Sequence, residues 1–214
     1  MKKYDGVIFD IDGTLTSTNE LIFSTFNHVT KKYLNKSMTN EEIIELFGPT
    51  EDKILEDWFG DDVEKVRKDY YTFYTANHEM ADIYPGMKEL LHFLKEKNVL
   101  LSIYTGKGRE ATLITLKKLG IYDLFDLVIS GSDVKEHKPS PEGIQMFLDK
   151  FSLDKGKVLM VGDAPADIYS ARTAGVQVAS VVWDSYAYEK VMSMESDFVF
   201  HTVEELKTFF EKEI

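Results

Sequence analysis

Two hydrophobic patterns alternate along this chain. Short apolar runs such as 7–9, which lies between two glycines, are typical of strands buried on both faces of a parallel sheet. Longer segments repeat their apolar residues at helical spacing. The predicted strands are 7–9, 99–104, 127–130, 158–161, 176–182 and 198–200, and the helices that alternate with them are 85–97, 109–119, 141–151, 166–174 and 203–213. Such repeated units imply right-handed crossovers, so the sequence predicts an α/β fold with a doubly wound, Rossmann-like parallel sheet.

One long segment interrupts this alternation. No convincing strand lies between residues 16 and 81, where apolar residues recur only at helical spacing. The predicted helices of this segment are 21–34, 40–47, 51–59 and 62–78. We therefore expect residues 1–15 and 82–214 to form the α/β core, and residues 16–81 to form an inserted all-helical cap.

The composition indicates a folded protein with a packed core. The 214 residues are 43% hydrophobic and 13% aromatic, which suits one large domain or one domain with an insertion. Cysteine is absent, which excludes disulfides, thiolate zinc sites and a cysteine nucleophile, and fits a reducing compartment. No apolar run is long enough for an export signal or a membrane span, so we expect a cytoplasmic protein with no membrane partner.

The charge of the chain restricts its partners. Its formal net charge is −12, from 37 acidic and 25 basic side chains, with no basic run that would bind a nucleic-acid backbone. We therefore expect no nucleic-acid partner. A site for a small phosphorylated metabolite would need local positive charge from lysine, metal or helix N-termini. We expect a monomer or a weak dimer.

Polar residues follow four of the predicted strands at or just beyond their carboxyl ends. These residues are Asp10 with Asp12, Thr105 with Gly106, Lys138, and Asp163 with Asp167. In an open α/β sheet ligands bind at this edge. The four clusters are therefore expected to converge on one pocket, although they lie far apart in the sequence.

The polar residues named above lie in four short sequence motifs. They read DIDGT at 10–14, YTG at 104–106, HKPSP at 137–141 and GDAPAD at 162–167. In order and spacing the chain resembles the haloacid dehalogenase-like hydrolase superfamily, in its phosphoglycolate phosphatase and β-phosphoglucomutase branch. The resemblance covers the whole chain and includes a helical cap inserted after the first motif.

This resemblance implies a role for each core residue. Asp10 is expected to be the nucleophile, whose carboxylate attacks phosphorus and forms an aspartyl-phosphate. Asp12 is expected to be the general acid/base that protonates the leaving oxygen and then activates water. Taken alone, both aspartates also fit ordinary turn residues. Thr105, Gly106 and Lys138 are expected to bind the phosphoryl group.

Mg²⁺ is the cofactor that the resemblance implies. Asp10, Asp163 and the backbone carbonyl of Asp12 are its expected ligands, because Mg²⁺ prefers hard oxygen atoms and keeps several waters. Asp167 is expected to bind a coordinated water or to orient a ligand. Because it lies near a helix start, Asp167 also fits a first-turn acid that the helix dipole favours.

The cap is expected to determine which substrate is accepted. Residues 46–55 resemble the substrate-specificity loop of the family, and we expect Thr50 and Lys53 to contact the substrate. The same pattern would also fit a plain turn between two helices. Lys107, just after Thr105, is a further candidate for binding an anionic leaving group.

The function that these residues indicate is a Mg²⁺-dependent phosphatase acting on a small phosphorylated metabolite. The family branch suggests phosphoglycolate or pyrophosphate-like substrates. A phosphomutase is the main alternative, but mutases of this branch usually carry glutamate where this chain has Gly162. A dehalogenase is disfavoured because those enzymes lack an acid at the position of Asp12. The intact motifs also argue against a non-catalytic metabolite-binding module.

Overall fold

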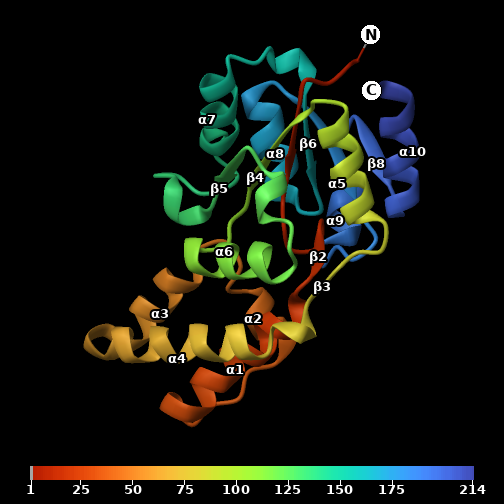
Figure 1. Ribbon diagram of the computed structural model, residues 1–214. Helices are drawn as coiled ribbons and strands as arrows, with labels where there is room; N and C mark the ends of the chain where they lie inside the picture. The colour runs from red at the N-terminus through yellow and green to blue at the C-terminus, as the bar shows by residue number, and fades with distance from the viewer. Residues whose placement is uncertain (1) are drawn as a thin grey trace.

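A six-stranded sheet forms the centre of the protein, whose computed structural model describes residues 2–214 (Figure 1). The strands are β1 (Gly6–Phe9), β4 (Leu100–Tyr104), β5 (Leu127–Ile129), β6 (Val158–Gly162), β7 (Gln177–Val181) and β8 (Phe198–Phe200). They lie in the order β5-β4-β1-β6-β7-β8, and each neighbouring pair is parallel. The doubly wound parallel sheet expected from the sequence is confirmed.

Helices cover both faces of this sheet. One face carries α5 (Met87–Glu96), α6 (Arg109–Lys118) and α10 (Val203–Glu213), and the other carries α7 (Glu142–Phe151), α8 (Pro165–Ala174) and α9 (Tyr188–Met192). The residues of β1 alternate between the two layers, because Val7 and Phe9 belong to the first hydrophobic cluster and Ile8 to the second. All three are fully buried, as the apolar run predicted.

β1 lies where the chain switches from one half of the sheet to the other. The chain adds β4 and β5 on one side of β1, and then β6, β7 and β8 on the other side. The carboxyl ends of β4, β1 and β6 therefore meet at the kind of crevice that binds ligands in open α/β sheets. The N–H of Asp10 donates to the Val161 carbonyl at 3.0 Å, which fixes the first residue after β1 against the sheet.

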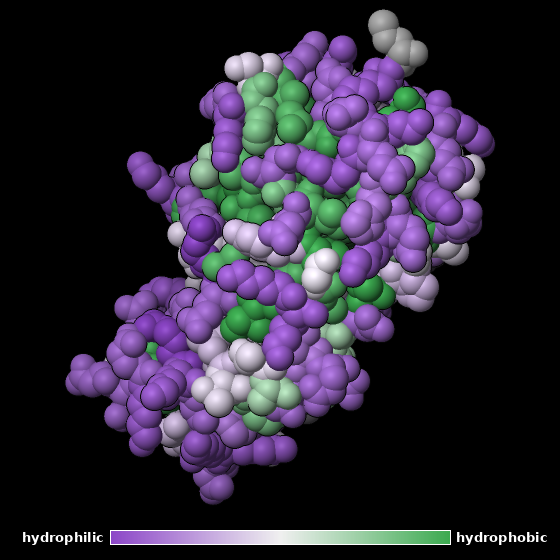
Figure 2. Space-filling model, in the orientation of Figure 1, coloured by the Kyte–Doolittle hydropathy of each residue, from purple (hydrophilic) through white to green (hydrophobic). Residues whose placement is uncertain are grey.

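Four further helices form a layer at the carboxyl edge of the sheet, at the bottom of Figure 1. They are α1 (Asn19–Leu34), α2 (Asn40–Ile44), α3 (Glu51–Phe59) and α4 (Val63–Ala76). Their apolar residues form a third hydrophobic cluster, which contains Phe26, Leu55 and Tyr70. The same cluster includes Ala111 of α6, so the layer is packed against the core. Its outward surface is mostly hydrophilic in Figure 2.

Side-chain caps begin two of these helices, as the sequence predicted. Thr39 Oγ1 accepts a hydrogen bond from the Glu42 N–H at 3.2 Å, and the Glu42 carboxylate accepts one from the Thr39 N–H at 2.8 Å. The helix is shorter than predicted and ends at Ile44. Thr50 Oγ1 accepts a hydrogen bond from the Lys53 N–H at 3.3 Å at the start of α3.

The expectation of no strand between residues 16 and 81 is wrong at its first two residues. β2 (Thr16–Ser17) pairs antiparallel with β3 (Asp82–Ile83), and the pair joins the two places where the chain crosses between the layers. Two-residue strands are too short to show a period of two in the sequence.

Other short elements also carry too little pattern for a prediction. They are α9 and the 3₁₀ turns η1 (Gly60–Asp62), η2 (His78–Met80), η3 (Tyr122–Leu124), η4 (Gly131–Asp133) and η5 (Lys155–Lys157). Within residues 2–214, no helix has both the length and the hydropathy that crossing a membrane requires.

A buried polar contact joins α4 to α6. The Tyr74 hydroxyl lies 2.7 Å from Thr115 Oγ1, and His78 Nε2 lies 3.2 Å from the same oxygen. Tyr74 and Thr115 are fully buried. Because buried polar groups need such partners, separating the two helices would expose or orphan them.

Gly143 in α7 is the first test of this packing. An added Cβ would lie 2.3 Å from two ring atoms of Tyr104, which is fully buried at the end of β4. Gly143→Ala should therefore lower stability by about 1–3 kcal/mol through overpacking, more than the ~1 kcal/mol gained in helix propensity. Thermal unfolding should show a melting temperature several degrees lower.

Gly156→Ala is the matched control, because its nearest neighbour to an added Cβ is Asp154 Oδ1 at 3.4 Å, an ordinary contact. Equal melting temperatures for the two variants would contradict the packing argument.

Candidate active site

The carboxyl edge of the sheet opens into a cavity of about 290 Å³. The strand ends form one wall, where Asp10 follows β1, Thr105 follows β4 and Asp163 follows β6. The helical layer forms the opposite wall, from Asn19 in α1 to Ile54 in α3. The cavity is lined by Asp10, Asp12, Thr105, Gly106, Lys107, Lys138, Asp163 and Asp167 among the residues that the sequence singled out.

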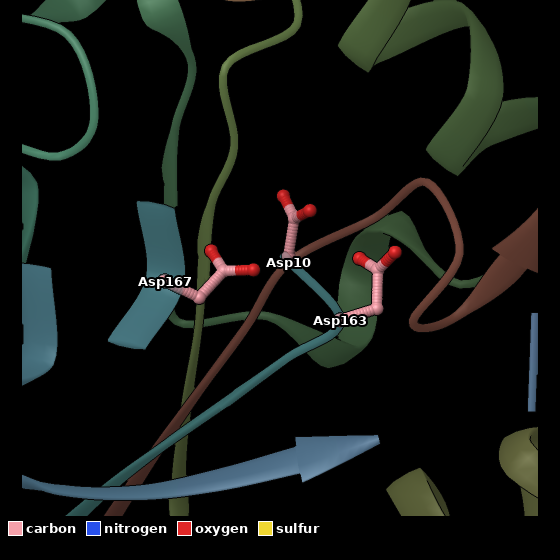
Figure 3. Close-up of side chains that lie close together, drawn as sticks. All are labelled: Asp10, Asp163 and Asp167. Atoms are coloured by element: carbon pink, nitrogen blue, oxygen red, sulfur yellow. The ribbon is translucent and has the colours of Figure 1, made fainter. Parts of the chain in front are cut away.

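Three aspartates lie together on the core wall of this cavity (Figure 3). Each of Asp10, Asp163 and Asp167 offers a carboxylate oxygen, and the three oxygens lie within 4.8 Å of one another. Asp163 Oδ2 is buried and has no hydrogen-bond partner among the described residues, whereas Asp10 Oδ1 is also buried and forms an ion pair with Lys138 but no hydrogen bond. Buried oxygens without partners indicate a missing ligand, and hard oxygens in such a group suit a divalent cation.

Two glycines let the backbone approach these carboxylates closely. Gly13 has φ +76°, and a Cβ there would lie 2.4 Å from Asp163 Oδ2. A Cβ on Gly162 would lie 2.3 Å from the Asp167 carboxyl carbon. The glycines of the first and fourth motifs are therefore steric requirements of the aspartate cluster.

Asp167 lies both at a helix start and in the aspartate cluster. It lies in the first turn of α8, where its Oδ2 accepts a hydrogen bond from the Ala164 N–H at 3.0 Å. Its Oδ1 accepts a hydrogen bond from Lys138 Nζ at 2.6 Å. The helix start thus orients a carboxylate that also belongs to the cluster.

Lys138 provides positive charge beside the cluster. Its Nζ lies 3.1 Å from Asp10 Oδ1 and 2.6 Å from Asp167 Oδ1. Burial alone would lower the pKa of this ammonium, but attraction to Asp10 and Asp167 outweighs burial and raises it. Lys138 is therefore charged at neutral pH and holds Asp10 in a fixed place.

Burial also changes the pKa values of the aspartates themselves. It raises the pKa of Asp163 well above the usual range, and the charges of Asp10 and Asp167 raise it further. Burial raises the pKa of Asp167 to about 6, although the Lys138 ammonium acts in the opposite direction. The one ammonium of this cluster contacts two of its three carboxylates, so the cluster favours binding of a further cation.

Asp12 is paired with a second lysine. Its Oδ2 lies 3.2 Å from Lys107 Nζ, and its Oδ1 accepts a hydrogen bond from the Thr18 hydroxyl. The Lys107 side chain is 1% exposed. Burial would lower the pKa of Lys107, but Asp12, Tyr74 and Glu51 raise it well above its ordinary value. Asp12 is thus oriented from two sides, beside Asp10 but separate from its ion pair.

Glu51 is a site residue that the sequence reasoning missed. It is the first residue of α3 and 7% exposed, and it reaches across the cavity to the core. Its Oε2 accepts a hydrogen bond from the Gly108 N–H at 2.6 Å, and its Oε1 accepts one from Lys107 Nζ at 3.3 Å. Nothing in the sequence distinguishes Glu51 from an ordinary first-turn acid, because the chain pattern alone does not say what a helix start faces.

The structure places Thr50 and Lys53 differently from the sequence expectation. Thr50 Oγ1 is used to cap α3, and the residue does not line the cavity. Lys53 Nζ lies 2.7 Å from Asp57 Oδ1, on an exposed side of the same helix. Thr50, as the extended N-cap residue, and Lys53 therefore point elsewhere; Lys53 lies about 200° from Glu51 around the helix axis, because successive helical residues are about 100° apart.

Aromatic side chains cover another part of the cavity and were also missed. Phe47, which lies between α2 and α3, contacts Tyr186 in the loop after β7. The two rings pack edge to face, with their centroids 5.5 Å apart. The neighbouring Ser185 hydroxyl donates to the Asp163 carbonyl at 2.6 Å, which ties this loop to the aspartate cluster. No motif in the sequence marked this loop.

Comparison with known proteins now identifies relatives. The family model for haloacid dehalogenase-like hydrolases matches residues 7–181. The pyrophosphatase PpaX of Bacillus pumilus is 34% identical over 205 residues, covering 94% of this chain and 93% of that protein. A predicted phosphoglycolate phosphatase from Haemophilus somnus has the same fold, with a TM-score of 0.87 at 24% identity and coverage of 98% and 99%. A provisionally named β-phosphoglucomutase from Thermotoga maritima has a TM-score of 0.78 at 25% identity, with coverage of 98% and 100%.

Asp163→Asn tests the repulsion within the aspartate cluster. A carboxyl whose pKa is raised by folding destabilises the fold at pH values above both pKa values, and the destabilisation fades as pH falls through the folded pKa. In protein free of divalent cations, Asp163→Asn should therefore raise the melting temperature at about pH 8 by roughly 2–6 °C. The gain should shrink toward about pH 5, where Asp163 and Asp167, the latter with a pKa of about 6, take up protons.

Scanning calorimetry across this pH range gives the measurement. Asp61→Asn removes one exposed carboxylate outside the cavity and should leave the melting temperature nearly unchanged. If Asp163→Asn instead melted at a lower temperature than wild type at about pH 8, repulsion would not dominate this cluster.

Proposed function

Because the chain belongs to the haloacid dehalogenase-like hydrolase family, we propose that it is a Mg²⁺-dependent phosphatase that hydrolyses a small phosphorylated metabolite through an aspartyl-phosphate on Asp10. The relatives named pyrophosphatase and phosphatase support hydrolysis of a phosphoryl group. One observation carries the detailed proposal. Asp10 lies at the cavity floor between the Lys138 ammonium and a group of buried, incompletely paired carboxylate oxygens.

The oxygen donors of the site fit Mg²⁺. In the cluster, Asp163 Oδ2 is buried without a hydrogen-bond partner and Asp10 Oδ1 is paired with the Lys138 ammonium, and both oxygens are hard ligands. We assign these two side chains and the Asp12 backbone carbonyl as ligands, with Asp167 orienting them. Mg²⁺ bound there would neutralise the charge that otherwise separates an anionic phosphoryl group from the Asp10 carboxylate.

The first half of the proposed reaction transfers the phosphoryl group to the protein. A carboxylate oxygen of Asp10 forms a bond to phosphorus while the bond from phosphorus to the leaving oxygen breaks. Asp12 gives its proton to that oxygen, so the leaving group departs as a neutral alcohol. Lys138 and Thr105, with the N–H groups after Thr105, hold the phosphoryl oxygens and stabilise their charge.

The second half returns Asp10 to its free state. Asp12, now a carboxylate, takes a proton from a water that attacks phosphorus, and the bond between phosphorus and the Asp10 oxygen breaks to release inorganic phosphate. The Thr18 hydroxyl and Lys107 Nζ contact the two oxygens of the Asp12 carboxyl group and keep the group oriented in both steps. One residue thus serves first as acid and then as base.

We further propose that residues 16–81 act as a cap over the core formed by 1–15 and 82–214. The helical layer provides the wall of the cavity opposite the strand ends, so closing it would keep bulk water from the aspartyl-phosphate. The paired β2 and β3 are then the connection about which the layer would move.

Retention of the phosphoryl group for a mutase reaction is less well supported. Mutases of this branch usually carry glutamate at the position of Gly162, and even a Cβ at this position would lie 2.3 Å from the Asp167 carboxyl group. A glutamate there would need a different arrangement of the fourth motif. The site as built favours transfer to water.

Asp10→Asn is the direct test of the covalent route. The substitution removes the nucleophile and almost no volume, so kcat should fall by roughly 10⁴ or more while the protein stays folded. Phosphate release from a panel of phosphorylated metabolites, together with thermal unfolding, gives both readouts. Asp61→Asn is the control for loss of one negative charge. Near wild-type turnover by folded Asp10→Asn protein would exclude this mechanism.

Chelation tests the metal. Treatment with EDTA should abolish phosphate release, and Mg²⁺ should restore it. As a readout that does not depend on turnover, Mg²⁺ at about 100 times its Kd should stabilise the wild-type fold by about 2.7 kcal/mol and should stabilise Asp163→Asn much less. Full activity after exhaustive chelation, or an equal thermal shift for Asp163→Asn, would count against this metal site.

A further inference from the structure

The cap wall of the cavity is largely apolar. Ile22 and Phe26 of α1, Leu46 and Phe47 after α2, and Ile54 of α3 all line it. A phosphoryl group held by Lys138 and Thr105 lies on the opposite wall, so the leaving group is the part of a substrate that meets these side chains. Apolar walls favour a leaving group that brings apolar surface with it.

Negative charges outnumber positive charges around the cavity, and each positive charge is already paired. Two ammonium groups line it, and each is shared by two carboxylates: Lys138 by Asp10 and Asp167, and Lys107 by Asp12 and Glu51. Asp163 is a fifth carboxylate. Within residues 2–214, no other lysine, arginine or histidine lines the cavity. One divalent cation would offset part of this excess at the phosphoryl side but would place no positive charge on the cap.

Glu51 adds a fixed negative charge to the leaving-group side. Its carboxylate is held by the Gly108 N–H at 2.6 Å and by Lys107 Nζ at 3.3 Å, so it cannot turn away without losing both partners. The side chain is 9% exposed, and its charge is therefore weakly screened by water. A second anion buried beside Glu51 would remain unpaired, because both lysines that line the cavity already have carboxylate partners.

We propose that this cavity selects phosphate monoesters whose leaving group is an uncharged, partly apolar alcohol, and that Glu51 is the residue that discriminates against anionic leaving groups. The inference rests on the proposed phosphatase function. The proposed selectivity argues against pyrophosphate-like or carboxylate-bearing substrates, the kinds that the family branch suggested. It also gives Lys107 a role in positioning Asp12 and Glu51 in place of binding the substrate.

The size of the cavity restricts the alcohol further. About 290 Å³ lies at the lower limit of the volumes that hold drug-sized ligands, so a phosphoryl group leaves room for a small leaving group, about one ring in size. The edge-to-face pair of Phe47 and Tyr186 borders this space and offers aromatic contact to such a ring.

A matched pair of substrates tests the inference. Benzyl phosphate and 4-carboxybenzyl phosphate differ by one carboxylate on the leaving group, and both carry an alkyl leaving oxygen. With Mg²⁺ and enough salt to screen surface charge, wild type should prefer benzyl phosphate at least about tenfold in kcat/KM. Pyrophosphate should be a poorer substrate than benzyl phosphate. Equal use of the pair, or a preference for either anionic leaving group, would overturn the inference.

Glu51→Gln then tests the assigned residue. It keeps the size of the side chain and one of its two acceptor oxygens and removes its charge, so the ratio of kcat/KM between the two esters should move toward unity. Asp57→Asn is the matched control, because it removes one exposed carboxylate from the same helix and should leave the ratio as in wild type. A ratio that is unchanged in Glu51→Gln, or changed equally in Asp57→Asn, would remove Glu51 from this role.

Binding measurements separate this inference from the proposed function. Calorimetric titration with the non-hydrolysable benzylphosphonate and 4-carboxybenzylphosphonate needs no turnover and should show the same preference. Phe47→Ala should weaken benzylphosphonate more than inorganic phosphate, which does not reach the cap. If no ester is hydrolysed but benzylphosphonate binds preferentially, the phosphatase proposal fails and the selectivity stands. If esters are hydrolysed but the phosphonates bind equally or not at all, the selectivity fails and the phosphatase proposal stands.

Discussion

The mutual repulsion of three buried carboxylates is the constraint on which the rest of the structure depends. Asp10, Asp163 and Asp167 have oxygens within 4.8 Å of one another, and burial raises the pKa values of the last two. Such a cluster is unfavourable for folding in the absence of a cation. It persists because β1 and β6 are neighbouring central strands of a sheet with apolar helices on both faces, and the packing of that core offsets the local penalty.

The two lysines contact separate pairs of carboxylates. Lys138 contacts Asp10 and Asp167, whereas Lys107 contacts Asp12 and Glu51. The first pair lies wholly within the core, but the second joins the core to the helical layer through Glu51. Because Asp12 and Glu51 share one ammonium, a movement of the layer that withdraws Glu51 changes the surroundings of Asp12 as well. The position of the helical layer and the orientation of Asp12, the proposed acid/base, are therefore physically linked.

The sequence predicted the core far better than the cap. Apolar runs such as Val7–Phe9 locate buried strands, and the polar residues that follow them must meet at one edge of a parallel sheet, so Asp10, Thr105 and Asp163 could be brought together without coordinates. No comparable rule predicts which residues of the helical layer face the cavity. The first turn of α3 includes Glu51 and Lys53 and is capped by Thr50. Only the rotation of this helix about its axis decides which of these three residues faces the cavity. That rotation follows from the third hydrophobic cluster, which is a property of packing.

The same difference explains why family motifs describe the reaction better than the substrate. In the proposed mechanism the motif residues hold the phosphoryl group, which all substrates of such an enzyme share, so these residues carry no information about the leaving group. The leaving group proposed here would meet side chains such as Phe26 and Ile54, together with the charge of Glu51, and none of these residues belongs to a motif. A relative that is 34% identical can therefore share the chemistry and still differ in the few cap positions that set charge and polarity. For this chain those positions are apolar or negative, and they favour a neutral alcohol over a second anion.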